Sequence, residues 1–102
     1  MSGTADRIDV EMSDATVVVR GELDAFSAAQ LSDALAPRLT GETLVLDLRA
    51  VTFIDSRGLA ALLQVHRNAE QSGGAVQMIA SGRVRRLFEI AGLDGYLRID
   101  EG

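Results

Sequence analysis

Residues 43–69 read TLVLDLRAVTFIDSRGLAALLQVHRNA, and this stretch decides the fold. Its first part, Thr43 to Leu48, is a dense apolar run that is too short for a helix, so we expect a central strand covered on both faces. Residues 49–54 are expected to form a loop. From Asp55 onward, leucines recur at helical spacing until the pair Gly73-Gly74, which predicts the clearest helix in the chain.

The residues before this stretch predict a hairpin and a first helix. Apolar and acidic residues alternate from Ile8 to Met12, and three valines follow a turn signal, so a β-hairpin is expected over residues 7–20. Leucine spacing then predicts a helix from Ala28 to Leu39, with Pro37 near its end. A hairpin followed by strands and helices in alternation is typical of an α/β domain.

The residues after this stretch complete the predicted sheet. Strands are expected over residues 75–80 and 96–99, and Ser81 is expected to cap the helix between them. Strands joined by helical crossovers run parallel with right-handed connections. We therefore predict one α/β domain over residues 1–102, with an N-terminal β-hairpin, a mixed and mostly parallel β-sheet, and helices packed on it.

Composition excludes several classes of function. The formal net charge of -5 has the wrong sign for holding nucleic-acid phosphates. All ten basic residues are arginine, and the absence of lysine excludes a Walker A loop and a Schiff-base enzyme. The lack of cysteine and the single histidine argue against thiol nucleophiles, disulfides and His or Cys metal clusters. We expect no cofactor and no bound metal.

The distribution of apolar residues gives an expectation about location. Residues 1–7 lack the apolar stretch of a signal peptide, and no run approaches the ~18 apolar residues of a membrane span. We therefore expect a cytoplasmic protein that binds neither a membrane nor nucleic acid.

Ser56 stands at the junction between a strand and a helix, which makes it the first candidate site. The first backbone N–H groups of a helix have no partner within the helix, and with the helix dipole they favour an anion, including a phosphate on a side chain. The other interpretation is that Ser56 is simply the N-cap of the helix, with Asp55 improving the same helix start. The residues alone leave both interpretations open.

A hydrolase is the next interpretation of the same turn, and its geometry fails. Position 54 is isoleucine, where the G-x-S-x-G pattern requires glycine. His66 lies roughly 15 Å further along the helix at 1.5 Å per residue, which is beyond the reach of a general base. We expect His66 to pack at the edge of the core, and we expect the protein not to be an enzyme.

The segment Gly21-Glu22-Leu23-Asp24 also follows a strand and precedes a helix. If the two strands are parallel neighbours, both loops emerge at the same end of the sheet, where ligands and partners of open α/β sheets bind. Asp24 is then expected near Ser56. Asp24 is also a good helix cap, and the residues alone do not choose between a cap and a contact.

Three segments of the chain carry a family resemblance. They are Gly21-Glu22-Leu23-Asp24, then Leu46-Asp47-Leu48 with Val51-Thr52-Phe53-Ile54-Asp55-Ser56-Arg57-Gly58-Leu59, and Val84-Arg85-Arg86-Leu87-Phe88-Glu89-Ile90-Ala91-Gly92-Leu93. Together, and in this order, they resemble the STAS-domain anti-sigma factor antagonists. The resemblance covers nearly the whole chain, and its middle segment is the specific one.

This resemblance implies a partner-switching protein with no catalysis of its own. In the family, the unphosphorylated form binds an anti-sigma factor that is also a serine kinase and so releases a sigma factor; phosphorylation breaks the complex, and a serine phosphatase restores it. The phosphorylated serine of the family maps to Ser56. The expected partner-binding residues are Glu22, Asp24, Asp55, Ser56, Arg57, Gly58 and Ser81.

Arg57 departs from the commonest family pattern, which has a second serine or another small residue at this position. The departure removes a neighbouring hydroxyl and leaves Ser56 as the single acceptor in the motif. The alternative function is a STAS subunit that regulates or scaffolds a transporter or signalling complex without phosphorylation. The presence of the Ser56 hydroxyl favours the first interpretation.

Overall fold

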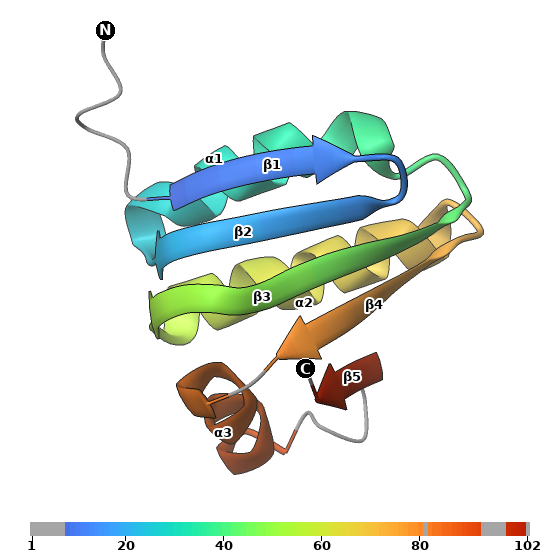
Figure 1. Ribbon diagram of the computed structural model, residues 1–102. Coiled ribbons are helices and arrows are strands. Elements are labelled where there is room, and N and C mark those ends of the chain that lie inside the picture. Colours follow the sequence, from blue (N-terminus) through green and yellow to red (C-terminus); the bar gives the residue numbers. More distant parts are fainter. Residues whose placement is uncertain (1–7, 81, 93–97, 102) are drawn as a thin grey trace, which may run out of the picture.

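The computed structural model describes residues 8–80, 82–92 and 98–101 (Figure 1). The elements are β1 (Ile8–Ser13), β2 (Thr16–Leu23), α1 (Ala25–Leu35), the 3-10 helix η2 (Ala36–Arg38), β3 (Thr43–Ile54), α2 (Ser56–Gln71), β4 (Ala75–Ala80), α3 (Gly82–Ile90) and β5 (Arg98–Glu101). Strand β4 has the bounds that the sequence predicts. The predicted Ser81 cap, and residues 96 and 97 of the predicted last strand, lie outside the described residues.

The five strands form one sheet in the order β1-β2-β3-β4-β5. Strands β1 and β2 form an antiparallel hairpin, and the pairs from β2 to β5 are all parallel. The hairpin turns at Asp14, whose φ of 51° lies in the left-handed region that aspartate tolerates better than most residues. The predicted α/β fold with a mixed, mostly parallel sheet is confirmed.

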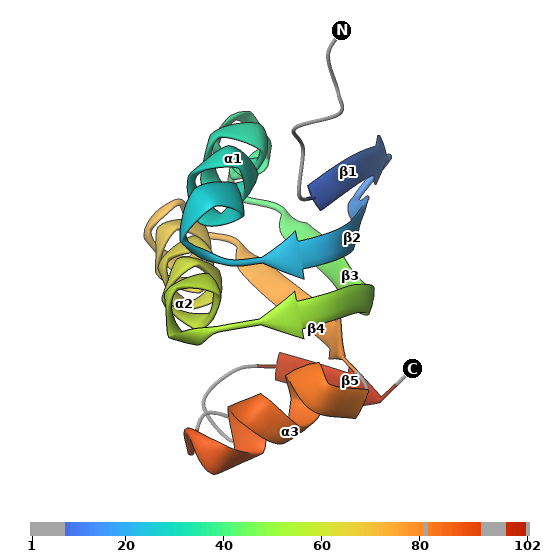
Figure 2. The same cartoon turned by 90° about the vertical axis from the view of Figure 1, so that its left-hand side faces the viewer.

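Helices α1 and α2 lie side by side on one face of the sheet, and α3 packs against β3 (Figure 2). The buried side chains are almost all aliphatic, and among the phenylalanines that the structure describes, Phe88 of α3 is the buried one. In β3, Leu44, Leu46 and Leu48 point into this core, whereas Val45 and Asp47 are only half-buried. The prediction that this strand is covered on both faces is therefore wrong, because α1 and α2 cover one face only.

Strand β3 continues to Ile54, so the predicted loop over residues 49–54 is wrong. The register between β2 and β3 shifts twice, between Val18 and Arg20 and again between Gly21 and Glu22, and each shift leaves one extra residue on β3. Such bulges interrupt the alternation of inward and outward side chains, which is the signal used to recognise a strand. The Thr52 hydroxyl in the second bulge donates to the Gly21 carbonyl at 3.2 Å.

The first helix begins earlier and ends earlier than predicted. It runs over Ala25–Leu35, and Pro37 lies in the following 3-10 helix, so Leu39 is not helical. Proline has no N–H to donate to the carbonyl four residues before it, and its ring clashes with that turn. The chain therefore tightens into η2 at this point.

On the open face of the sheet, Asp47 and Arg49 form a two-point ion pair. The Asp47 Oδ1 accepts from the Arg49 backbone N–H and Nε, both at 3.0 Å, and Oδ2 accepts from Nη2 at 2.8 Å. Only 13% of the Asp47 side chain is exposed. The hydrogen bonds from the Arg49 side chain hold the pKa of the Asp47 carboxyl below its ordinary value and outweigh its desolvation.

This lowered pKa predicts a specific loss of stability in acid. Because the folded state prefers the ionised carboxylate, its contribution is complete above the unfolded pKa of about 4 and disappears as the pH falls through the folded pKa. We expect Asp47→Asn to be less stable than wild type at pH 7, with the difference shrinking toward pH 2. Urea unfolding across this range measures it, with Asp33→Asn on α1 as the control for loss of one charge. A constant difference at every pH contradicts the assignment.

Candidate functional site

Strands β2 and β3 end side by side, and each is followed at once by a helix. Leu23 pairs with Ile54 at the last position of the parallel ladder, and the Asp55 N–H donates to the Leu23 carbonyl at 3.2 Å. Figure 2 looks onto this end, with the first turns of α1 and α2 beside the ends of the two strands. The expectation that both loops emerge at the same end of the sheet is confirmed.

Asp24 is the N-cap of α1. Its Oδ1 accepts from the backbone N–H groups of Phe26 at 3.0 Å and Ser27 at 3.1 Å. The Ser27 hydroxyl accepts from the Asp24 N–H at 2.9 Å and donates to the Glu22 carbonyl at 2.6 Å, which closes a capping box. The cap interpretation of Asp24 is confirmed. Sequence reasoning missed the buried Ser27, although a hydroxyl three residues after an N-cap is a recognisable capping signal.

Asp55 is the N-cap of α2, so the sequence-based interpretation of Ser56 as the cap needs correction. The Asp55 Oδ1 accepts from the backbone N–H groups of Arg57 at 3.0 Å and Gly58 at 2.9 Å, so Asp55 is the N-cap. Ser56 is the first residue of the helix and is exposed. The interpretation of Ser56 as the N-cap is therefore wrong. The carboxylate one residue earlier already binds the free N–H groups, and the Ser56 hydroxyl carries neither capping bond.

Gly58 allows the start of α2 to lie directly against the end of β2. A Cβ at this position would stand 2.3 Å from the Leu23 carbonyl oxygen and 2.9 Å from its carbonyl carbon, and both distances are shorter than non-bonded contacts of a Cβ atom. Gly58 is therefore required for close packing rather than for an unusual backbone angle. Together with the Asp55 bond to Leu23, this contact fixes the start of α2 relative to the end of β2, which holds Glu22, and to Asp24 that follows it.

The remaining predicted site residues divide by exposure. Glu22 and Arg57 are exposed, Asp24 and Asp55 are half-buried, and Gly58 is buried. Three carboxylates and the exposed Ser56 hydroxyl thus belong to the end of the sheet where β2 and β3 finish side by side. His66 is 8% exposed on α2, with its Nε2 3.5 Å from the Glu70 Oε2, and its expected position at the edge of the core is confirmed.

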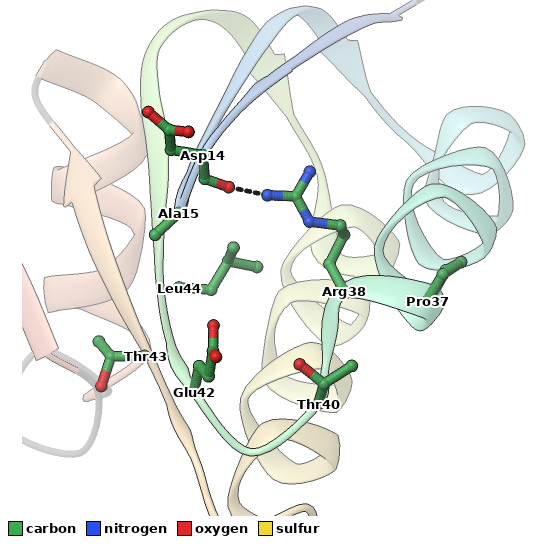
Figure 3. A pocket seen from close by; sticks show the side chains of 8 residues that line it. All are labelled: Asp14, Ala15, Pro37, Arg38, Thr40, Glu42, Thr43 and Leu44. Carbon is green, nitrogen blue, oxygen red and sulfur yellow. Dashed lines mark hydrogen bonds between the residues drawn. The ribbon is translucent and has the colours of Figure 1, made fainter.

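A hollow lies at the opposite end of β3, and none of the predicted site residues lines it (Figure 3). It has a volume of about 450 Å³, and the Arg38 guanidinium in its wall donates to the Asp14 carbonyl, tying η2 to the hairpin turn. Its lining residues are Asp14, Ala15, Pro37, Arg38, Thr40, Glu42, Thr43 and Leu44. The candidate site is therefore an exposed surface and not this hollow.

Comparison with known proteins identifies the family. The model of the family described as "Mlab, STAS domain" matches residues 7–99 of the chain. The chain belongs to the STAS-domain family. The resemblance seen in the sequence is thereby confirmed. In this STAS domain, the capping bonds of Asp24 and Asp55 begin the first two helices.

Relatives of this STAS domain carry regulatory names. An anti-sigma-B factor antagonist of Staphylococcus aureus is 32% identical over 89 residues, which cover 84% of this chain and 82% of the relative. The crystal structure of an anti-sigma factor antagonist from Mycobacterium paratuberculosis superimposes with a TM-score of 0.73 at 31% identity, covering 90% of this chain and 82% of that one. The phosphorylated form of SpoIIAA, a Bacillus cell fate determinant, gives a TM-score of 0.65 at 25% identity, with coverages of 91% and 90%.

These relatives are named as antagonists of regulatory factors and not as enzymes, which agrees with the expectation that this STAS domain has no catalytic activity. Of the helices that the structure describes, none has the length and apolar character needed to cross a bilayer.

The close packing at Gly58 predicts that alanine at this position lowers the stability of the domain, the opposite of its usual effect inside a helix. Replacing glycine by alanine inside a helix normally stabilises it, by up to about 1 kcal/mol. Here the added Cβ collides with the Leu23 backbone, so we expect Gly58→Ala to lower the free energy of unfolding by about 1–3 kcal/mol. Chemical denaturation measures the change, and Ala60→Ser, at an exposed position of the same helix, is the control. A Gly58→Ala variant more stable than wild type contradicts the close contact.

Proposed function

We propose that this STAS domain is an anti-sigma factor antagonist controlled by phosphorylation of Ser56. In its unphosphorylated form it binds an anti-sigma factor that is also a serine kinase, and this binding releases a sigma factor for transcription. Phosphorylation of Ser56 ends the binding, and a serine phosphatase restores it. The protein acts in the cytoplasm and contacts neither a membrane nor nucleic acid.

The exposed Ser56 hydroxyl carries this proposal. Ser56 is exposed, so its hydroxyl is accessible to a kinase. Asp55 supplies the capping oxygen, so the Ser56 hydroxyl is not needed to begin α2. A scaffold that only binds its partner has no use for a hydroxyl in this position. The names of the relatives, one of them solved in a phosphorylated form, support the same assignment.

A phosphate on Ser56 is compatible with the fold. Phosphoserine adds about -1.5 to -2 charges at pH 7. Ser56 is the first residue of a helix of 16 residues, where the backbone dipole favours negative charge. The group projects from an exposed side chain, so it displaces no core residue. We therefore expect the phosphorylated domain to remain folded.

The same phosphate is unfavourable for binding. It joins the carboxylates of Glu22, Asp24 and Asp55 at one end of the sheet, and a partner that covers this end has to desolvate the added charge. A loss of about 3–4 kcal/mol lowers affinity several hundred-fold, which is enough for an on/off switch. The proposed contact residues are Glu22, Asp24, Asp55, Ser56, Arg57, Gly58 and Ser81.

The acceptor is tested by phosphorylation. With the cognate anti-sigma kinase and ATP, we expect the wild-type chain to gain one phosphate and Ser56→Ala to gain none while still binding the kinase. Intact-mass spectrometry measures the gain. Ser72→Ala, at an exposed serine near the far end of α2, is the matched control and is expected to behave as wild type. Phosphate found on Thr52 or Ser81 contradicts the assignment.

The separation of fold from binding is tested with a charge mimic. We expect Ser56→Asp to melt within a few degrees of wild type, because the position is exposed and favours negative charge, and yet to bind the kinase more weakly. Calorimetry measures both quantities, and Ser56→Asn controls for size without charge. If Ser56→Asp unfolds, or binds as tightly as Ser56→Asn, the proposed mechanism is wrong.

A further inference from the structure

The described residues expose four large apolar side chains, and three of them gather around the end that holds Ser56. Phe26 is 80% exposed in the first turn of α1, Phe53 is 44% exposed next to the end of β3, and Ile90 is 74% exposed at the end of α3. The fourth, Met12, is 37% exposed near the opposite end of the sheet, where it pairs with Val17. Exposed apolar side chains gathered at one site mark an interaction surface.

Beside Ser56 this apolar surface is hollowed. A groove of about 210 Å³ lies between the end of β3 and α3, lined by Ile54, Arg86, Leu87 and Ile90. Ile54 directly precedes the Asp55 cap, so the groove borders the first turn of α2. Its volume is below the roughly 300 Å³ at which small-molecule sites begin, which favours a side chain of a protein over a metabolite.

The exposed Phe26 and the groove belong to elements on opposite sides of the start of α2. Viewed onto this end of the sheet in Figure 2, the first turn of α1 lies above the start of α2, and α3 lies below it. Phe26 belongs to the first turn of α1, and three of the four residues that line the groove belong to α3, so the start of α2 lies between the elements that carry them. A kinase that phosphorylates Ser56 has to cover the position between them, so contact with both sides requires no second partner.

We propose that the anti-sigma kinase docks on both sides of Ser56, with an apolar surface over Phe26 and an aliphatic side chain in the groove of Ile54, Leu87 and Ile90. This inference rests on the proposed function and adds the surface through which the partner binds. Among the described residues that line the groove, Arg86 is the charged one, so we expect the partner to place a carboxylate beside its aliphatic side chain.

This arrangement explains why one phosphate would be decisive. The residues that dominate binding energy cluster at the centre of an interface, where surrounding contacts exclude water. With apolar contacts on both sides, Ser56 lies at that centre rather than at the wet rim. A phosphate placed there has to lose its water to preserve the contacts around it.

The experiment uses the anti-sigma kinase of the source cell, identified as the kinase that the Ser56→Ala chain retains and then purified. We expect Ile90→Ser and Phe26→Ser each to weaken its binding at least about tenfold in calorimetry, since buried apolar anchors commonly have effects of this size. Met12→Ser is the matched control, because it removes an exposed apolar side chain at the opposite end; its affinity is expected to stay within about twofold of wild type.

Hydrogen exchange of the wild-type complex provides a second readout that needs no variant. We expect the kinase to protect backbone amides at residues 24–28 and 86–91 and to leave residues 9–13 unchanged. If Ile90→Ser and Phe26→Ser bind as wild type while Ser56→Asp binds weakly, the docking surface is wrong and the proposed function stands. If Ser56→Asp also binds as wild type, or if no kinase is retained, both fail.

Discussion

The parallel pairing of β2 with β3 is the constraint on which the rest of this STAS domain depends. It places the ends of two strands side by side at Leu23 and Ile54, and the Asp55 N–H then bonds to the Leu23 carbonyl. Gly58 lets the first turn of α2 lie against the same carbonyl, because it has no Cβ to collide with it. Two loops that are 31 residues apart in the chain, as measured from Leu23 to Ile54, thereby become one surface.

The elements that the sequence predicts well are those with an uninterrupted hydrophobic period. Helix α2 keeps its apolar stripe from Leu59 to Ala69, and strand β4 alternates buried and half-buried residues from end to end. Strand β3 was shortened in the prediction because its two bulges each shift the alternation by one residue. Beyond the first bulge, apolar and polar residues no longer alternate along β3, although its backbone stays paired with β2.

The candidate site was predicted in position but not in its bonding. Ser56 and Asp55 are both good capping residues, and only the backbone decides which of them stands outside the helix. The extended conformation of Asp55, with φ of -113° and ψ of -173°, gives it the cap and leaves Ser56 as the first helical residue. The position of Ser27 under the loop of Asp24 depends equally on the bend after β2, which no periodic pattern records.

The division of labour between Asp55 and Ser56 has a consequence for the regulation of this domain. Asp55 begins the helix, and in the proposed function the neighbouring Ser56 carries the phosphate, so a substitution at Ser56 removes the proposed control without removing the cap. Under that proposal, a change at this single position alters the regulation and leaves the start of α2 in place. The same chain without the Ser56 hydroxyl is then expected to fold and bind as an adaptor that is always on.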